Sequence, residues 1–161
     1  MLFSTLGLRE EIQRKLKDSG YIEPTPVQQK VIPLILQKQD IMARAQTGSG
    51  KSASFVLPVL ELLSKREVPG KPKIKVLVLT PTRELTLQVA DTFVSFSRYL
   101  PKKPKVVSVI GGEKLGDQMA AIQKGCDVVV ATSGRLLEIL KKQQINLGKV
   151  EFFILDEADK M

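Results

Sequence analysis

Five short runs of mostly apolar residues recur along the chain, separated by segments with helical spacing. Each run is nearly continuous in apolar character, which is typical of a strand covered on both faces in a parallel sheet. Strands that alternate with helices predict an α/β fold with right-handed crossover connections. The predicted strands are Ile41–Ala45, Lys75–Thr80, Val106–Ile110, Asp127–Ala131 and Phe152–Asp156. The predicted helices are Arg9–Ser19, Pro26–Lys38, Lys51–Ser64, Arg83–Tyr99, Lys114–Gln123 and Leu136–Lys142.

The length and composition fit one soluble domain. The chain has 161 residues, with 43% hydrophobic and 26% charged residues, so it can bury a core and is not expected to be disordered. Two stretches that contain proline, Glu67–Lys73 and Pro101–Pro104, are predicted to be loops. No apolar run is long enough to span a membrane, and the N-terminus lacks a signal-peptide pattern, so we expect a cytoplasmic protein.

The numbers of cysteine and histidine residues limit the kinds of metal site and catalytic site that the chain can form. Cys126 is the single cysteine, and it precedes the apolar run Val128–Val130, which favours a packed thiol over a disulfide framework. The absence of histidine excludes His–Cys metal sites and Ser-His-Asp catalysis. The net charge of +8 favours a polyanionic partner, although a solvated lysine-rich surface gives the same value. We interpret Lys102, Lys103 and Lys105 as such a solvated loop and leave them out of the site.

A phosphate-binding loop is predicted at AQTGSGKS, residues 45–52, between a predicted strand and a predicted helix. Gly48 and Gly50 permit backbone angles that turn successive N–H groups inward, toward a polyphosphate at the helix N-terminus. Lys51 is predicted to reach the phosphates, and Ser52 to ligate Mg²⁺. The alternative is a Gly/Ser-rich turn without function, and Ala45 stands where the general pattern has Gly.

Asp156 and Glu157 end the last predicted strand. An acid at the carboxyl edge of an open α/β sheet lies where such sheets bind ligands, and a phosphate-loop enzyme needs one near its metal. Asp156 is therefore a predicted metal ligand, and Glu157 a predicted base for the attacking water. A polar helix start is the alternative.

Beyond these motifs, the chain resembles the DEAD-box RNA helicases, closest in look to bacterial members of the RhlE type. The likeness lies in AQTGSGKS and Asp156-Glu157-Ala158-Asp159, and in four further motifs that run along the chain in family-like order. These motifs are GYIEPTPVQ at 20–28, PTREL at 81–85, Gly111-Gly112 and TSGR at 132–135, where Ser133 replaces the usual Pro.

The resemblance implies an α/β RecA-like P-loop NTPase domain over residues 1–161, with an adenine-recognition segment at 1–29. It implies ATP and Mg²⁺ as cofactors and Lys51, Asp156 and Glu157 as catalytic residues. The implied nucleotide-binding residues are Phe3, Tyr21, Thr25, Gln28, Gln46, Thr47, Gly48, Ser49, Gly50, Lys51 and Ser52. A glutamine amide can pair with adenine N6 and N7, so Gln28 could select ATP over GTP. Phe3 is open to two interpretations, base stacking and core packing.

For RNA, the resemblance implies sequence-independent phosphate contacts. The implied residues are Pro81, Thr82, Arg83, Gly111, Gly112, Thr132, Gly134 and Arg135. It also implies a second RecA-like domain, absent from these 161 residues, so we expect weak nucleotide binding and almost no hydrolysis by this chain alone. A small-molecule kinase and a non-enzymatic RNA-binding module are the competing functions.

Overall fold

The chain divides into two compact units in the computed structural model, which describes residues 1–66, 69–142 and 145–161. Unit 1 consists of Met1–Glu67 and Thr92–Lys103. Unit 2 consists of Val68–Asp91 and Pro104–Met161. The prediction of a single helicase domain over 1–161 stays a prediction.

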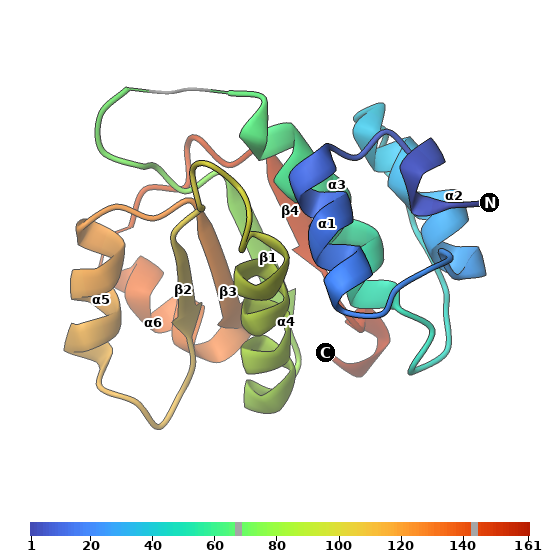
Figure 1. Cartoon of the computed structure of the whole chain (residues 1–161). Helices are drawn as coiled ribbons and strands as arrows, with labels where there is room; N and C mark the ends of the chain where they lie inside the picture. The colour runs from blue at the N-terminus through green and yellow to red at the C-terminus, as the bar shows by residue number, and fades with distance from the viewer. Residues whose placement is uncertain (67–68, 143–144) are drawn as a thin grey trace. The chain divides into compact units, whose positions relative to one another are not determined.

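Unit 2 contains a parallel sheet of four strands in the order β2-β3-β1-β4 (Figure 1). The strands are β1 (Val76–Thr80), β2 (Val106–Val109), β3 (Val128–Thr132) and β4 (Phe152–Leu155). These bounds confirm four of the five predicted strands. A parallel sheet requires a crossover between strands, and the intervening helices provide it.

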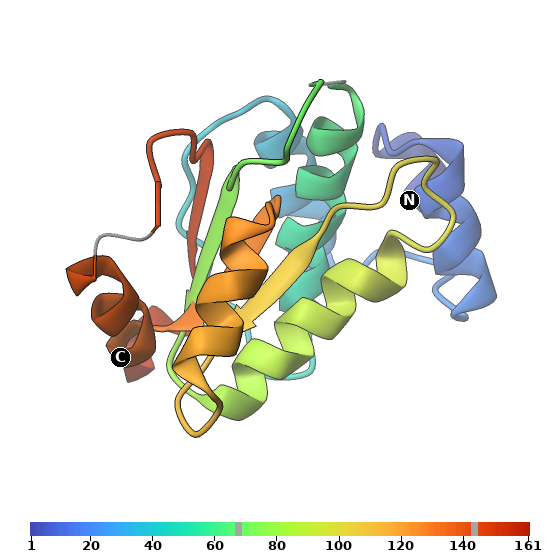
Figure 2. The same cartoon turned by 90° about the vertical axis from the view of Figure 1, so that its left-hand side faces the viewer.

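Helices lie on both faces of this sheet, as the α/β prediction requires. Leu77 and Val129 share a core with residues of α5 (Leu115–Gln123) and α6 (Ser133–Lys141). Figure 2 shows α5 rising from the loop that follows β2. Successive strand side chains point to opposite faces, so Thr80 lies on the face away from Leu77. Its hydroxyl is 2.6 Å from that of Thr86 in α4 (Arg83–Phe96), which places the start of α4 on that opposite face.

β4 departs from the prediction of strands buried on both faces. Phe153 and Leu155 are 57% and 49% exposed, whereas Phe152 and Ile154 are half-buried. β4 lies at the edge of the sheet, beside β1 alone. Within the described residues no helix of unit 2 covers its outer face, so the continuous apolar run was misleading there.

The predicted strand Ile41–Ala45 is wrong. Residues 41–46 of unit 1 form neither a strand nor a helix, and Met42 is completely exposed. A strand satisfies its N–H and C=O groups through a neighbouring strand. The described part of the chain supplies no such neighbour for this segment, so its backbone faces solvent.

Three helices and one short turn form most of unit 1. They are η1 (Phe3–Thr5), α1 (Glu10–Asp18), α2 (Pro26–Leu36) and α3 (Lys51–Ser64), and α2 packs against α3. α3 is apolar around most of its circumference, and Ala53–Leu62 are all buried. The three predicted helices are confirmed, and α2 ends two residues early at Leu36, shortly before Lys38 adopts a φ of +60°.

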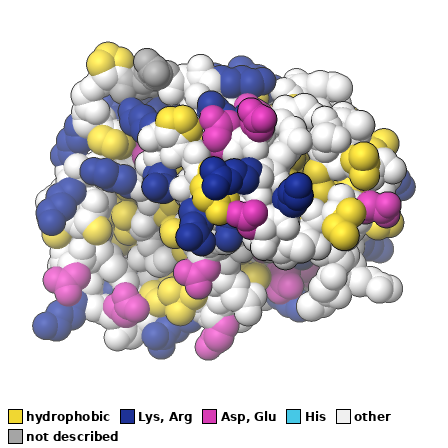
Figure 3. Space-filling model, viewed as in Figure 1, with side chains coloured by type: hydrophobic (Ala, Val, Ile, Leu, Met, Phe, Trp, Pro, Cys, Tyr) yellow, Lys and Arg dark blue, Asp and Glu magenta, His cyan; other side chains and the backbone are white. Residues whose placement is uncertain are grey.

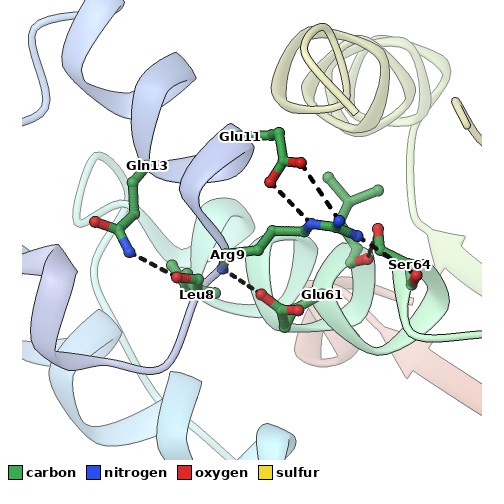
Figure 4. Close-up of polar contacts among 7 residues, drawn as sticks. Leu8, Arg9, Glu11, Gln13, Glu61 and Ser64 are labelled. Carbon is green, nitrogen blue, oxygen red and sulfur yellow. Dashed lines mark hydrogen bonds and ion pairs between the residues drawn. The ribbon is translucent and has the colours of Figure 1, made fainter. Parts of the chain in front are cut away.

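A buried carboxylate joins α1 to α3 within unit 1 (Figure 4). Glu61 in α3 is 4% exposed and accepts a hydrogen bond from the backbone N–H of Arg9, the residue just before α1. The Arg9 guanidinium also donates to the Ser64 carbonyl oxygen at 3.4 Å. An unpaired N–H at the start of α1 is thereby satisfied by the helix that follows the phosphate loop.

The remaining boundaries differ slightly from prediction. α4 ends at Phe96 rather than Tyr99, α6 begins at Ser133 rather than Leu136, and a short turn, η2 (Ala158–Lys160), was not predicted. The loop prediction for Pro101–Pro104 is confirmed, as is that for 69–73. Residues 67 and 68 of that second loop lie outside the described residues. None of the helices described is both long and apolar enough to cross a membrane.

Candidate nucleotide and nucleic-acid sites

The predicted phosphate loop forms the start of α3 in unit 1. Gly48 and Gly50 adopt φ values of +83° and +78°, the left-handed region that glycine enters without strain. The Ser49 N–H donates to the Gln46 carbonyl oxygen at 3.2 Å, which closes the turn before Lys51. Lys51 and Ser52 then occupy the first turn of α3, where unpaired helix N–H groups favour an anion.

Gln28 fixes this loop from α2. Its side chain is fully buried, and its amide nitrogen donates to the Gly50 carbonyl oxygen at 3.1 Å. Its amide oxygen accepts from the Thr25 N–H at 3.0 Å, and the Thr25 hydroxyl accepts from the Gln28 N–H at 3.4 Å. This reciprocal pair is a capping box. The segment Thr25-Pro26-Val27-Gln28 has the Thr-x-x-Gln spacing of a capping box, so the sequence could have signalled the cap, but not the contact with Gly50.

Besides its positive φ, Gly50 is required for a second reason, which is its close contact with the Gln28 side chain. A Cβ on Gly50 would lie 2.3 Å from the Gln28 amide nitrogen, whereas a Cβ on Gly48 would meet nothing within 4 Å. The Gln28 amide retains one further N–H and one further lone pair. The Gln28 side chain is fully buried, so these two groups do not reach the surface in this structure, and pairing with adenine stays a prediction.

The loop also has features that suit a triphosphate. The Ser49 hydroxyl is buried and has no hydrogen-bond partner among the described residues. A buried donor of this kind is satisfied by an acceptor from outside the chain, and a phosphate oxygen has that character. Gln46 and Thr47 are exposed at the start of the same loop. The residues present therefore fit the phosphates of ATP.

The two predicted aromatic contacts differ in exposure. Phe3 is 4% exposed, which the core-packing interpretation predicts. Tyr21 is 43% exposed, and its ring meets the Phe96 ring edge-on at a centroid distance of 5.9 Å. Stacking of either ring on adenine stays a prediction.

In unit 2, the motif residues lie at the carboxyl edge of the sheet. The strand register aligns Thr80 with Thr132, and the Asp156 N–H donates to the Leu79 carbonyl oxygen at 2.9 Å. The loop after β2 begins at the same level, since Val109 is aligned with Ala131. The parallel ladder thus brings four loops, from separate parts of the sequence, to one edge.

Arg83 lies against Gly112, the second glycine of the Gly111-Gly112 pair, at this edge. Gly112 has a φ of +83°, and a Cβ there would lie 2.8 Å from Nη1 of Arg83. The guanidinium therefore lies directly against the glycine backbone. Thr82, which follows Pro81, accepts a hydrogen bond from the Leu85 N–H at 3.1 Å through its hydroxyl and so caps α4.

The TSGR segment is the turn from β3 into α6. Thr132 is the last residue of β3, and Ser133 and Gly134 open the helix. Nη1 of Arg135 donates to the Glu113 carbonyl oxygen at 3.1 Å, and its Nε lies 3.8 Å from the Glu138 carboxylate. The contact with Glu113 joins the first turn of α6 to the loop after β2. The sequence did not indicate this link between Arg135 and Glu113.

The two acids after β4 have different environments. Asp156 is 3% exposed, whereas Glu157 is half-buried and lies 3.3 Å from Lys160 Nζ. Glu157 has φ +52° and ψ +48°, an unusual conformation for a non-glycine residue and one that recurs at functional sites. Ser52 belongs to unit 1 and Asp156 to unit 2, so their pairing at one Mg²⁺ stays a prediction.

Comparison with known proteins identifies the family. The model of the DEAD/DEAH box helicase family matches residues 25–161. The chain belongs to this family. It is 42% identical over 159 residues to the ATP-dependent RNA helicase DeaD of Escherichia coli strain K12, which covers 99% of this chain and 24% of that protein. It is 43% identical over 160 residues to DeaD of Buchnera aphidicola subsp. Acyrthosiphon pisum, covering 99% of this chain and 26% of that protein.

A solved structure supports the fold of this DEAD/DEAH-family chain. A DEAD box protein from the hyperthermophile Methanococcus jannaschii is similar with a TM-score of 0.89 and 41% identity, over 100% of this chain and 42% of that one. The fold is accordingly the predicted α/β, RecA-like domain. The chain spans about a quarter of the length of the DeaD relatives.

Proposed function

We propose that this chain is the N-terminal, ATP-binding motor domain of an ATP-dependent RNA helicase, which remodels or unwinds RNA duplexes using ATP hydrolysis. One observation carries the proposal. The strand register of unit 2 brings Arg83, Gly112, Arg135 and Asp156 to a single edge of a parallel sheet. Guanidinium groups and bare glycine amides at such an edge suit phosphates, and neither reads base sequence.

In this proposal the phosphate loop holds ATP. The N–H groups between Gln46 and Ser52 surround the phosphates, and Lys51 places its ammonium against them. The free N–H and lone pair of Gln28 pair with adenine, beside Tyr21 and Phe3. Thr25 holds Gln28 in place through the capping box.

Mg²⁺ suits the predicted ligands Ser52 and Asp156, because it binds one or two protein oxygens together with substrate phosphates. When bound, it neutralises charge on the phosphates. Glu157 orients and deprotonates the attacking water, and its unusual left-handed backbone supports a functional role for this residue.

RNA is the proposed partner, bound through sequence-independent phosphate contacts. The contacting residues are Pro81, Thr82, Arg83, Gly111, Gly112, Thr132, Gly134 and Arg135. A second RecA-like domain of the same protein is the other proposed partner. It supplies a cationic group to the transferring phosphate, a contribution that can reach about 10³–10⁵ in rate. We further propose a cytoplasmic protein and retain the RhlE-type likeness as a prediction, although the relatives named above are DeaD proteins.

The decisive experiment measures ATP turnover with and without RNA, on this chain and on a version that carries the proposed second domain. We expect RNA-stimulated turnover from the longer version and nearly none from the 161 residues alone. Equal turnover by both would overturn the two-domain proposal. A turnover that ignores RNA but follows a small phosphoryl acceptor would favour the kinase alternative, and nucleotide binding without any turnover would favour the non-enzymatic module.

The adenine assignment has its own experiment. Gln28→Ala in the longer version is expected to reduce the preference for ATP over GTP, whereas Gln29→Ala, in the same helix turn, should leave it unchanged. Because Gln28 also holds Gly50, thermal unfolding of both variants must be compared, so that lost stability is not mistaken for lost selectivity. An unchanged ATP/GTP ratio in a folded Gln28→Ala variant would refute the assignment.

A further inference from the structure

The opposite edge of the unit 2 sheet carries a second concentration of positive charge. Parallel strands begin at one edge, and lysines precede all four of these strands. Lys75 leads into β1, Lys105 into β2, Lys124 precedes β3 and Lys149 precedes β4. This amino edge lies at the far end of the strands from Arg83 and Arg135.

The first row of residues at this edge is balanced in charge. The register aligns Val76 with Val106, Val128 and Phe152 through their shared partners, so the residues before them form one row. That row consists of Lys105, Asp127, Lys75 and Glu151. Asp127 lies 3.9 Å from Lys75 Nζ and accepts from the Lys105 backbone N–H at 2.9 Å. The acids of this edge are therefore matched by lysines within the row.

Beyond the row lies a hollow of about 250 Å³, which we call the amino-edge hollow. Its floor is formed by Ile74, Ile122 and Cys126, all buried members of the unit 2 core. Lys71, Lys73 and Lys149 stand around it, and all three are exposed. Pro72, Gln123 and Asn146 complete its lining, so that no acidic side chain lines it among the described residues.

The geometry of the hollow is held by packing. Gly125 has a φ of +103°, and a Cβ there would lie 2.8 Å from Lys71 Cγ and 3.0 Å from the Pro72 carbonyl oxygen. The stem of Lys71 is thus pressed against the turn before β3. Lys149 comes from the separate segment before β4, so the lysines converge from two distant parts of the sequence. Lys124, next to Gly125, adds a further exposed cation at this edge.

The lining chemistry identifies the kind of ligand. Among the residues that the structure describes, the hollow is lined by three lysines and by no aromatic side chain. Without an aromatic it lacks both the stacking surface that binds bases and the large apolar anchors typical of protein interfaces. It is also smaller than pockets that enclose a drug-sized ligand, at about 300–1,000 Å³. A phosphate group of an extended chain fits this set of properties. Figure 3 shows Lys and Arg side chains spread over much of one face of the molecule, with Asp and Glu side chains among them.

We propose that the amino-edge hollow, with Lys71, Lys73 and Lys149, binds the phosphate backbone of RNA at a second place, separate from the motif residues at the carboxyl edge. This inference rests on the proposed RNA-dependent function. The contact is sequence-independent, and it lets one domain hold two segments of a folded RNA.

The test compares two triple variants of the 161-residue chain with equal changes in net charge. One carries Lys71→Glu, Lys73→Glu and Lys149→Glu. The control carries Lys17→Glu, Lys65→Glu and Lys141→Glu, all exposed lysines elsewhere. Binding to a fluorescein-labelled 20-nucleotide oligouridine is followed by anisotropy at several salt concentrations. At 0.1 M salt we expect the first triple to bind about 30- to 100-fold more weakly than the control. Its log–log salt slope should also be smaller in magnitude by about 2, since each single-strand phosphate contact contributes about 0.7.

Equal weakening by the two triples overturns the proposal, as does an absence of RNA binding by the parent chain at low salt. Competition by inorganic tripolyphosphate as effective, per charge, as by RNA would also overturn it, because the hollow would then be a small-anion site. Should the glutamate triple fail to fold, as judged by circular dichroism, the triple Lys→Gln variant replaces it with half the charge change. Arg83→Ala is measured in the same assay. Loss with Arg83→Ala but not with the lysine triple keeps the proposed function and rejects only the second contact.

Discussion

The phosphate loop of unit 1 and the carboxyl edge of unit 2 both carry groups that suit phosphates, but they are held in different ways. At the carboxyl edge, each loop continues from a strand of the hydrogen-bonded sheet, and the aligned register sets where the loops begin. The phosphate loop follows a segment with no strand at all, in which Met42 is completely exposed. It is held from the other side, by the buried Gln28 amide on the Gly50 carbonyl and by α3.

This difference predicts how each site responds to amino-acid substitution. A loop that leaves a sheet is positioned by many backbone hydrogen bonds, so no single side chain decides its place. The phosphate loop depends on one glutamine and two glycines. We therefore expect substitutions near Gly50 to affect folding and nucleotide binding together, whereas substitutions at the carboxyl edge should affect RNA binding with little loss of stability.

The largest expected effect is at Lys51. Lys51→Ala removes a charge-assisted contact to phosphate worth about 1.5–3 kcal/mol, which corresponds to about 10- to 100-fold weaker ATP binding. Titration with a fluorescent ATP analogue measures this loss, and Lys65→Ala, just past the other end of α3, is the control. RNA binding should not change. If RNA and ATP binding fell together, the two regions would not be separable in the way described above.

The next largest expected effect is that of Gly50→Ala on stability. The alanine must adopt φ near +78° and its Cβ would clash with the Gln28 amide, so we expect a loss of about 1–3 kcal/mol in the free energy of unfolding. Gly48→Ala shares the positive φ but meets nothing within 4 Å, and it should cost about 1–2 kcal/mol. Urea denaturation of both variants isolates the contribution of the Gln28 contact. Equal losses would show that the contact does not constrain the loop.

Arg83→Ala tests the other region of the comparison, the carboxyl edge of unit 2. We expect RNA binding to weaken about three- to tenfold, with a salt slope smaller by about 1, and we expect no change in ATP binding. Arg83→Lys keeps the charge but loses the planar fork that lies against Gly112, so it should restore the salt slope and only part of the affinity. Anisotropy with labelled RNA measures both. An unchanged salt slope in Arg83→Ala would exclude a phosphate contact by this residue.

The smallest effect concerns Cys126, under the amino-edge hollow. Burial raises the pKa of the Cys126 thiol to about 11 from an ordinary value of 9.0. The unfolded thiol ionises first as the pH rises, so this group stabilises the folded state fully below pH 9 and loses that contribution between about pH 9 and 11. Urea denaturation across this range should show a shallower fall in stability for Cys126→Ser than for the parent. A steeper or identical fall would contradict this assignment.

Much of the fold was predictable from local pattern. The apolar runs of β1 and β3 became central strands with almost all of their residues buried, whereas the run of β2 became a mostly half-buried edge strand. The pattern failed where neighbours were absent. Ile41–Ala45 has the composition of a strand but no partner strand in the described chain, and Phe153 in the edge strand β4 is 57% exposed.

In the candidate site, too, local features were predictable from the sequence and long-range contacts were not. Short-range patterns predicted the glycine turn of the phosphate loop and the start of α3 at Lys51, because each depends on residues only a few positions away. The cap at Thr25 was not predicted, although it joins residues only three positions apart. The hold of Gln28 on Gly50 joins residues 22 positions apart, as does the link of Arg135 to Glu113, and no local pattern indicates either. The stacking and adenine roles of Phe3, Tyr21 and Gln28 stay predictions.

The sequence by itself determined the strand–helix alternation, the family and the chemical character of each loop, since these follow from side-chain types and their spacing. Only the tertiary structure decided which loops meet. The register of the parallel strands brought Arg83 against Gly112 at one edge and the hollow of Lys71, Lys73 and Lys149 to the other. Strand order and register depend on packing between residues far apart in the chain, and that information is not carried by any single segment.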